Sequence, residues 1–372
     1  MLIKCQLTHV GFIVLCCFFA TNLLSASSNA LEHIQKNDSD ASQTNLEQLK
    51  DFALAKINDD RKNFGLDPVF QSNNTAAQAQ ANELLKTQYI SHLTVDGLKP
   101  YMLYSLYNGT GYVQQNLGQI SYMDTKNTTG QNNNNDDNDR PDKDNNLTSS
   151  ELCSSAKKFY CAPIDPYKAI ENLEYLMIYD DKKCCNDGHK NNTLYPFHTH
   201  VSLGIAFNKY YFVMVQNFEN RYLGSDYQIQ KDGENIKLEA KILEQNKTNF
   251  LINHVSFFLD DHPTKIVYEK NKNKTHYELG DLKLIVSKPL PQYIKYLQQD
   301  DGSYQIIEAK KWDLDKNGVN LEIKLPEYLN VKDKVLTMVV YAKKADSVDD
   351  ENGQNDYSDP PIPLTSHTFF NS

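Results

Sequence analysis

The chain has 372 residues, of which 40% are hydrophobic and 23% are charged, and its formal net charge is −10. This length and composition favour a globular protein of about two domains and argue against a disordered or fibrous chain. The acidic excess is spread along the sequence and would repel nucleic acid and anionic lipid headgroups, so neither is expected as a partner.

Residues 1–30 predict a signal peptide. Lys4 precedes a short apolar core, "GFIVLCCFFATNLL", and the small residues "SASSNA" follow it. A retained membrane anchor is the alternative, but the apolar run is short for a bilayer span, so the pattern favours cleavage after Ala26 or Ala30. No later stretch is apolar enough to cross a membrane. We therefore expect a secreted or cell-surface protein.

Two helices are predicted after a flexible polar lead-in at residues 31–44. The first begins at the capping box "TNLE" (44–47) and ends before Gly65 and Pro68. The second runs from near Asn74 to near Tyr89. Its apolar stripe consists mainly of small residues, which would let it pack closely against another element: Ala77, Ala81, Leu84 and Leu85.

The middle of the chain predicts an insertion, a third helix and a hairpin. Residues 124–150 are rich in Asn and Asp and carry almost no apolar side chain, which indicates a disordered insertion. A calcium loop is the alternative, although the regular spacing of acids is missing. Asp165 and Pro166 then begin a long helix, and "VSLGIAF" and "YYFVMVQNF" predict a β-hairpin.

From residue 226 to 345, strand-like runs replace helical periodicity. Turn residues separate them, which favours an all-β, immunoglobulin-like sandwich of about seven strands. The runs are "IKLEAKIL", "HVSFFL", "KIVYE", "LKLIVS", "YQIIEAKKW", "VNLEIKL" and "KVLTMVVYA". Residues 346–372 are predicted to be a flexible tail.

The cysteines indicate two disulfides in an exported chain. Three would leave with the signal, and Cys153, Cys161, Cys184 and Cys185 remain. Side chains of adjacent residues diverge, so Cys184 and Cys185 are each expected to pair with Cys153 or Cys161. A zinc site built from cysteines and His189 is the alternative.

Asn-X-Ser/Thr sequons are frequent and predict a glycosylated surface. They lie at Asn37, Asn73, Asn108, Asn127, Asn146, Asn191, Asn246 and Asn273. A glycan on Asn191 would crowd the neighbouring His189.

Four motifs between residues 46 and 220 resemble the CAP superfamily of cysteine-rich secretory, antigen 5 and pathogenesis-related proteins. In chain order they are "INDDRKNFGLDPV", "SHLTVDGLKP", "GYVQQNLG" and "DGHKNNTLYPFHTHVSLGIAF". Their order and spacing match the family's helix and Gly-Leu-x-Pro turn, its Ser-His motif, its Gly-Tyr and Glu-Asn motif, and its Gly-His motif. The resemblance does not extend to the C-terminal region.

The resemblance implies an α-β-α sandwich over residues 45–222, so that the whole fold is α+β. It also implies a cleft in which two histidines and two acids can hold zinc or another divalent metal. His92 and His189 match the histidines, and Asn192 matches a family Asn that would hold backbone at the turn. Gln115 stands at the position of the first acid and is a poor zinc ligand. The candidates for the second acid are Glu174, Asp180 and Asp181.

Two further histidines lie within the fourth motif, and a serine precedes His92. His198 and His200, two apart at a strand, would share a face and are predicted to be an exposed pair. No His-Glu-x-x-His motif is present, and Ser91 next to His92 would not face it, so an enzyme is not the favoured hypothesis.

We therefore expect the cleft to bind a lipid, glycan or peptide, while the β-sandwich meets an envelope component or surface protein. A metal-dependent hydrolase of envelope polymer or peptide, and a structural glycoprotein with an idle cleft, are the alternatives.

Overall fold

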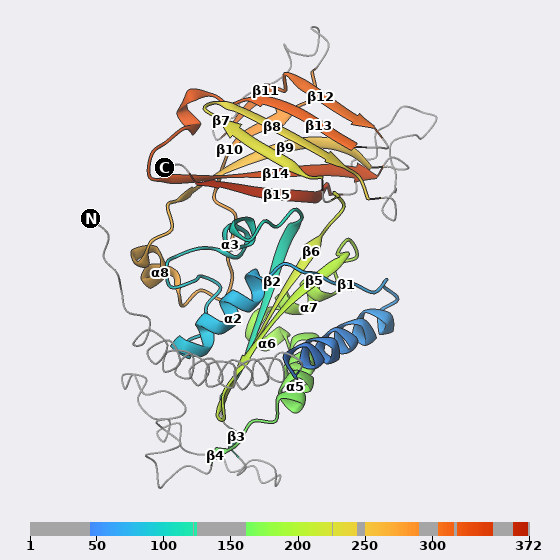
Figure 1. Cartoon of the computed structure of the whole chain (residues 1–372), viewed down its shortest axis with the longest axis vertical. Coiled ribbons are helices and arrows are strands. Elements are labelled where there is room, and N and C mark those ends of the chain that lie inside the picture. Colours follow the sequence, from blue (N-terminus) through green and yellow to red (C-terminus); the bar gives the residue numbers. More distant parts are fainter. Residues whose placement is uncertain are drawn as a thin grey trace, which may run out of the picture. The chain divides into compact units, whose positions relative to one another are not determined.

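The computed structural model describes residues 45–121, 123–124, 161–224, 226–243, 250–289, 304–315, 318–344 and 360–370 (Figure 1). The predicted signal peptide, the lead-in and residues 125–150 of the predicted insertion lie outside these ranges. The chain divides into two units after Asp51, and the description below concerns the second unit, Phe52–Ser372.

The helices predicted from periodicity are present. The first spans residues 45–63 and ends before Gly65, whose φ of 74° is the left-handed conformation that glycine adopts readily. The second is α2 (Ala76–Thr87), and the third is α5 (Pro166–Tyr179). The Asp165 carboxylate accepts a bond from the backbone N–H of Tyr167, as its predicted N-cap position requires. Three shorter helices are α3 (Pro100–Leu106), α6 (Lys182–Cys185) and α7 (Gly188–Thr193).

A four-stranded sheet forms the centre of the α/β region. Its order is β1 (Phe70–Gln71), β5 (His200–Phe207), β6 (Tyr211–Asn220) and β2 (Tyr112–Ser121), which leaves β2 at an edge. The predicted hairpin is confirmed, because β5 and β6 pair antiparallel from His200 opposite Glu219 to Phe207 opposite Phe212. A separate two-stranded sheet pairs β3 (Met123–Asp124) with β4 (Cys161–Ala162); both strands lie between β2 and β5 in the sequence.

Helices α2 and α5 cover opposite faces of this sheet. Leu117 of β2 packs in one apolar cluster with Ala77 and Ala81 of α2. At the next residue, a Cβ on Gly118 would collide with Leu173 of α5. Successive residues of a strand point to opposite faces, so the two helices sandwich the sheet. The small-residue stripe of α2 allows close packing as predicted, since a Cβ on Gly204 of β5 would meet the Ala77 carbonyl.

The C-terminal region contains two sheets. One has the order β11 (Gln305–Glu308), β10 (Asp281–Ser287), β9 (Phe250–Asp261), β14 (Lys334–Lys344), β15 (Ile362–Phe370). The other has the order β12 (Lys311–Asp315), β13 (Gly318–Lys324), β8 (Asn235–Lys241), β7 (Gln228–Asp232). Alternate residues of both sheets, such as Leu238, Leu321, Phe257 and Met338, form one buried apolar cluster, which makes the pair a β-sandwich.

Three predictions about this region are wrong. The run "KIVYE" forms α8 (Lys265–Asn271), because Thr264 caps a helix there and accepts a bond from the Val267 N–H. The run "YQIIEAKKW" divides between β11 and β12, which belong to different sheets. The predicted flexible tail contributes β15, which pairs with β14 and buries Leu364. Pairing with a long neighbouring strand orders a segment whose own sequence is rich in Pro, Ser and Thr.

The sandwich packs on the α/β region through α3 and β15. Tyr101 and Met102 of α3 share a buried cluster with Val335 of β14. The Tyr101 hydroxyl donates to Asp260 of β9 over 2.7 Å, and Lys99 pairs with the same carboxylate at 2.6 Å. Apolar burial and charged hydrogen bonds therefore join the two regions within the second unit.

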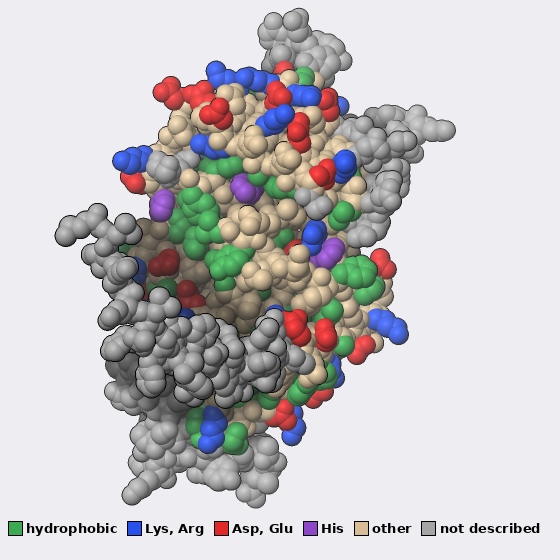
Figure 2. Space-filling model, in the orientation of Figure 1, with side chains coloured by type: hydrophobic (Ala, Val, Ile, Leu, Met, Phe, Trp, Pro, Cys, Tyr) green, Lys and Arg blue, Asp and Glu red, His purple; other side chains and the backbone are tan. Residues whose placement is uncertain are grey.

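On the face drawn in Figure 2, acidic and basic side chains are interspersed over the β-sandwich. Within the described part of the chain, no helix combines the length and apolar character needed to cross a membrane.

Candidate functional site

Two neighbouring cavities follow the edge strand β2. The first has a volume of about 640 Å³ and the second about 860 Å³, and His92, Cys185, His189 and Thr275 line both. Gln115 of β2 lines the first cavity, whereas Leu117 and Gln119 line the second. Together they form one groove along β2, named here the β2 groove, with the two predicted histidines at its middle.

His92 enters the β2 groove from the α2 side of the sheet and is held neutral. Its Nδ1 lies 3.0 Å from Gln115 Oε1, and its ring packs 5.0 Å from the ring of Tyr277. Burial, with smaller contributions from the nearby His189 and His276, lowers the pKa of His92 to about 4, although the hydrogen bonds to Gln115 and to the Thr275 backbone oppose the shift. The side chain is therefore an uncharged polar group at neutral pH.

Gln115 organises a network of amides beneath His92. Its Nε2 donates to Gln80 Oε1 over 2.8 Å and to Asn217 Oδ1 over 2.9 Å. Gln80 in turn donates to the backbone carbonyls of Ser91 and His92. An acid at position 115 would bring a negative charge into this buried network, whereas glutamine supplies both a donor and an acceptor without one.

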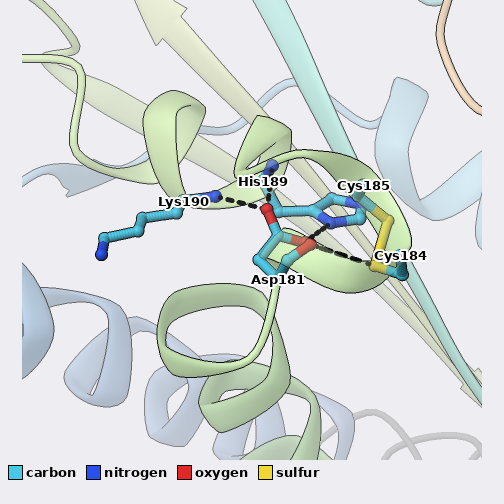
Figure 3. The surroundings of a disulfide bond; sticks show 5 residues. All are labelled: Asp181, Cys184, Cys185, His189 and Lys190. Atoms are coloured by element: carbon cyan, nitrogen blue, oxygen red, sulfur yellow. Dashed lines mark hydrogen bonds and ion pairs between the residues drawn. A yellow bond between two sulfur atoms is a disulfide. The ribbon is translucent and has the colours of Figure 1, made fainter.

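His189 enters from the opposite side, on α7, and is oriented by Asp181. Its Nδ1 lies 2.6 Å from Asp181 Oδ1, and Asp181 Oδ2 accepts the backbone N–H of His189 at 2.8 Å and of Lys190 at 3.2 Å (Figure 3). A carboxylate only accepts, so the neutral imidazole carries its proton on Nδ1 and leaves Nε2 free of this pair. Of the three candidate acids, Asp181 is the one that meets a predicted histidine.

The other two acids lie away from the β2 groove. Glu174 of α5 is buried and accepts a bond from the Gln216 amide, and burial raises the pKa of its carboxyl to about 8. Asp180 is exposed at the end of α5. No Asp or Glu is among the described residues that line either cavity. The set of ligands implied by the resemblance was His92, His189 and two acids. Because no described residue that lines either cavity is an acid, this set is a poor fit to a divalent metal.

The cysteine pairing predicted from the sequence is wrong. A disulfide joins Cys184 to its neighbour Cys185 (Figure 3). Cys153 and the side chain of Cys161 lie outside the described residues. Cys184 and Cys185 are the last two residues of the short helix α6, and Asn186 and Asp187 follow with positive φ angles of 52° and 62°. One ligand atom from each of four residues, Asp181, Cys184, Cys185 and His189, lies within 4.8 Å of the other three.

Two expectations about the neighbouring turn are also corrected. His198 is buried, not exposed: it stacks on Phe218 and hydrogen-bonds Asn220 and Asn192, and burial lowers its pKa to about 3. His200 is half-buried. Asn192 was expected to hold backbone, but its amide joins Asn116 to His198 through side chains.

One part of the groove was not predicted at all. The segment between α8 and β10 belongs to the sandwich region, yet Thr275, His276, Tyr277 and Leu279 line the first cavity. The Tyr277 hydroxyl accepts the backbone N–H of Gln115 on the open edge of β2, over 2.9 Å. The sequence carries no local signal for this contact, because it joins residues 162 positions apart.

Two remaining predictions have structural outcomes. Ser91 is buried, and its hydroxyl accepts the backbone N–H of Leu93. Of the sequons, Asn73, Asn108, Asn191 and Asn273 are exposed; the others fall outside the described residues. Asn273 lines the second cavity, so a glycan there would stand at the rim of the groove.

A scan against protein-family models finds no match to this chain, and a search of curated proteins finds none either.

Proposed function

We propose that this protein is an exported binding protein of CAP type whose β2 groove takes a glycan. The α-β-α arrangement of the N-terminal region, the β-sandwich that follows it and the signal-like N-terminus are the basis for the cellular and family part of this proposal. On this view the sandwich region meets a component of the cell envelope or a surface protein.

The proposal of a glycan ligand rests on the side chains that line the β2 groove. Amides are the most frequent polar side chains in it, and His92 adds an imidazole that is neutral at physiological pH. The amides are Gln88, Gln114, Gln115, Asn116, Gln119, Asn186, Asn192 and Asn273; the aromatic faces are Tyr89, Tyr101, Tyr112 and Tyr277; and four lysines, Lys182, Lys183, Lys272 and Lys274, also line the cavities. Sugar hydroxyls both donate and accept, as amides do, and the apolar faces of sugar rings pack on aromatic rings. Among a lipid, a peptide and a glycan, the glycan matches this lining best.

The test is an array of neutral oligosaccharides probed with the purified protein. Gln114→Ala removes one lining amide whose side chain is partly exposed, so the fold should tolerate it. The loss of a hydrogen bond should weaken binding by about 3- to 10-fold. Gln228→Ala is the matched control, an exposed amide on β7 outside both cavities. Absence of any glycan binding, or equal loss in the control, would refute the proposal and leave the idle cleft as the better account.

A hydrolase remains the second candidate, on one observation. The Asp181–His189 pair has the arrangement of an oriented general base beside the groove. Turnover of any bound oligosaccharide, lost in His189→Gln, would favour the enzyme over the binding protein.

A further inference from the structure

We propose that reduction of the Cys184–Cys185 disulfide creates a binding site for a thiophilic divalent cation such as Zn²⁺. The two cysteine thiolates and His189 are the ligands, and Asp181 is the positioning residue behind His189. This inference does not depend on the glycan ligand.

The donor atoms are already gathered. One ligand atom from each of Asp181, Cys184, Cys185 and His189 lies within 4.8 Å of all the others. In Figure 3 one ring nitrogen of His189 meets Asp181, and the other ring nitrogen lies on the side of Cys185. Two thiolates and one imidazole are the donors that zinc prefers, at distances of about 2.3 Å and 2.0 Å. Small side-chain movements therefore complete the site.

Asp181 already orients His189 as a carboxylate orients a zinc-binding histidine. A histidine that binds zinc donates its other ring N–H to a carboxylate, which fixes the tautomer and the ring orientation. His189 makes this contact at 2.6 Å, and the carboxylate is itself held by two backbone N–H groups. Asp181 is buried, so solvent does not compete strongly for it.

The disulfide itself has little structural use. A disulfide stabilises a fold mainly by closing a loop of the unfolded chain, and a bond between neighbours encloses no intervening residue. Cys184 is exposed, which gives a reductant access to its sulfur. These features suit a bond that is made and broken better than one that only stabilises.

The chemistry is balanced by an external dithiol or phosphine. Two electrons from the reductant cleave the S–S bond and, with two protons, give two thiols, while a dithiol becomes a disulfide or a phosphine becomes its oxide. Binding of the cation then releases both thiol protons. In the oxidised state neither sulfur is a thiolate, so only His189 remains as a ligand from this set.

A site with three protein ligands leaves the fourth tetrahedral position open. Cys185 and His189 line both cavities, so the bound ion would face the β2 groove. The redox state of the vicinal cysteines would thus decide whether the groove contains a metal.

Cobalt(II) is the probe, because thiolate ligation gives it a charge-transfer absorption that nitrogen and oxygen ligands do not. The full-length exported protein is reduced with a phosphine, freed of reductant without oxygen and titrated with Co²⁺. We expect one equivalent to bind with the thiolate band, and the unreduced protein to show no such band. Competition with Zn²⁺ should abolish it.

The variants locate the site. Cys184→Ser with Cys185→Ser should remove the band, His189→Gln should weaken binding by at least about 10-fold, and Asp181→Asn by about 10- to 100-fold. His262→Gln, an exposed histidine of the sandwich, is the matched control. Failure of the reduced wild-type protein to give the band overturns the proposal without any variant having to fold. So does a loss in His92→Gln as large as in His189→Gln, which would place the ion between the two histidines.

Discussion

The two regions of the second unit bury different kinds of side chain. The cluster between the two sheets of the sandwich is built from apolar side chains, with Leu238, Leu321 and Phe257 each nearly or fully inaccessible to solvent. The α/β region buries charged and amide groups around its sheet: Arg61, Gln80, Gln115, Asn116, Glu174, Asp181, Gln216, Asn217 and Glu219. Burying such groups is unfavourable unless each is hydrogen-bonded, so this region depends on specific geometry while the sandwich depends mainly on apolar area.

Substitutions in the sandwich core should therefore change stability alone, whereas substitutions in the α/β region should change both stability and the groove. The sandwich core could exchange one aliphatic residue for another of similar volume at a cost of about 1 kcal/mol. The polar network of the α/β region leads from Arg61 and Asn116 to α7, the helix that carries His189, so a change there should alter the groove as well as the stability. Substitutions that leave one buried group unpaired test this contrast most directly.

The largest effect is expected from Arg61→Met. Arg61 is fully buried and donates to the backbone carbonyls of Asp67, Thr193 and Tyr195, which hold the end of α7. Loss of the guanidinium leaves these acceptors unpaired and should lower the free energy of unfolding by about 3–5 kcal/mol. Chemical denaturation measures the change.

Lys62→Met is the matched control, since Lys62 is the exposed neighbour on the same helix and should change stability by less than about 0.5 kcal/mol. Equal effects at positions 61 and 62 would contradict the contrast between the two regions.

The next effect depends on pH. Glu174 has a pKa of about 8 in the folded protein against an ordinary 4.5, because it is buried. Between these values the folded state keeps a proton that the unfolded state loses, so rising pH favours unfolding. The free energy of unfolding should fall by up to about 4 kcal/mol between pH 5 and pH 8 from this group alone.

Glu174→Gln removes the titration while keeping the shape and the acceptor for Gln216. Its denaturation midpoint should exceed that of the wild type at pH 8 and approach it at pH 5. Parallel pH profiles for the two proteins would show that Glu174 is ionised in the folded state. Glu171→Gln, on the same helix but partly exposed and paired with Lys56, is the control that should leave the profile unchanged.

Periodicity and capping signals predicted much of the fold. The spacing of Ala77, Ala81 and Leu84 required a helix with one close-packed face, and the alternation of "VNLEIKL" required a strand, and both are present. The errors have two causes. Residues 362–370 became an ordered strand through pairing with β14, a partner that local sequence does not specify. The run "KIVYE" became a helix because Thr264, directly before it, is an N-cap, a local signal that the β-branched residues of the run outweighed in the prediction.

The candidate site divides in the same way. The motifs pointed to His92 and His189, and both residues line the same cavities. Asp181 was one of three acids that spacing could not separate, because its choice depends on where α6 turns. Tyr277 and the Cys184–Cys185 bond were missed, since the first contact spans two regions and the second contradicts the usual separation of paired cysteines.

A smaller effect is expected where the two regions meet. Asp260 of β9 is almost fully buried and pairs with both Lys99 and the Tyr101 hydroxyl. Asp260→Asn removes the charge that both contacts use and should cost about 2 kcal/mol. If this interface couples the two regions, the wild-type protein should unfold in a single transition. In Asp260→Asn that transition should be broader or divide into two.

The adjacent Asp261 provides the control. It pairs with Lys334 at 2.5 Å, and this hydrogen bond lowers the pKa of Asp261, but its side chain is 70% exposed. Exposed ion pairs contribute little, so Asp261→Asn should cost less than about 1 kcal/mol. A larger loss at 261 than at 260 would mean that burial does not set the strength of these contacts.

The smallest effect is expected from Tyr277→Phe, which removes one oxygen atom. The Tyr277 hydroxyl accepts the N–H of Gln115 at the open edge of β2, and the ring of phenylalanine can still pack on His92. The unpaired N–H should cost about 1 kcal/mol. Hydrogen exchange measured by mass spectrometry or NMR should show faster exchange at the Gln115 amide.

Tyr328→Phe removes a comparable hydroxyl, one that donates to the Lys283 carbonyl at an exposed site of the sandwich, and should leave stability within about 0.5 kcal/mol. If exchange at Gln115 is unchanged in Tyr277→Phe, solvent already reaches that edge. The segment from the sandwich would then line the groove without closing the strand edge. Faster exchange confined to Gln115 and its neighbours on β2 would instead mean that the sandwich region completes the hydrogen bonding of the sheet that carries the site.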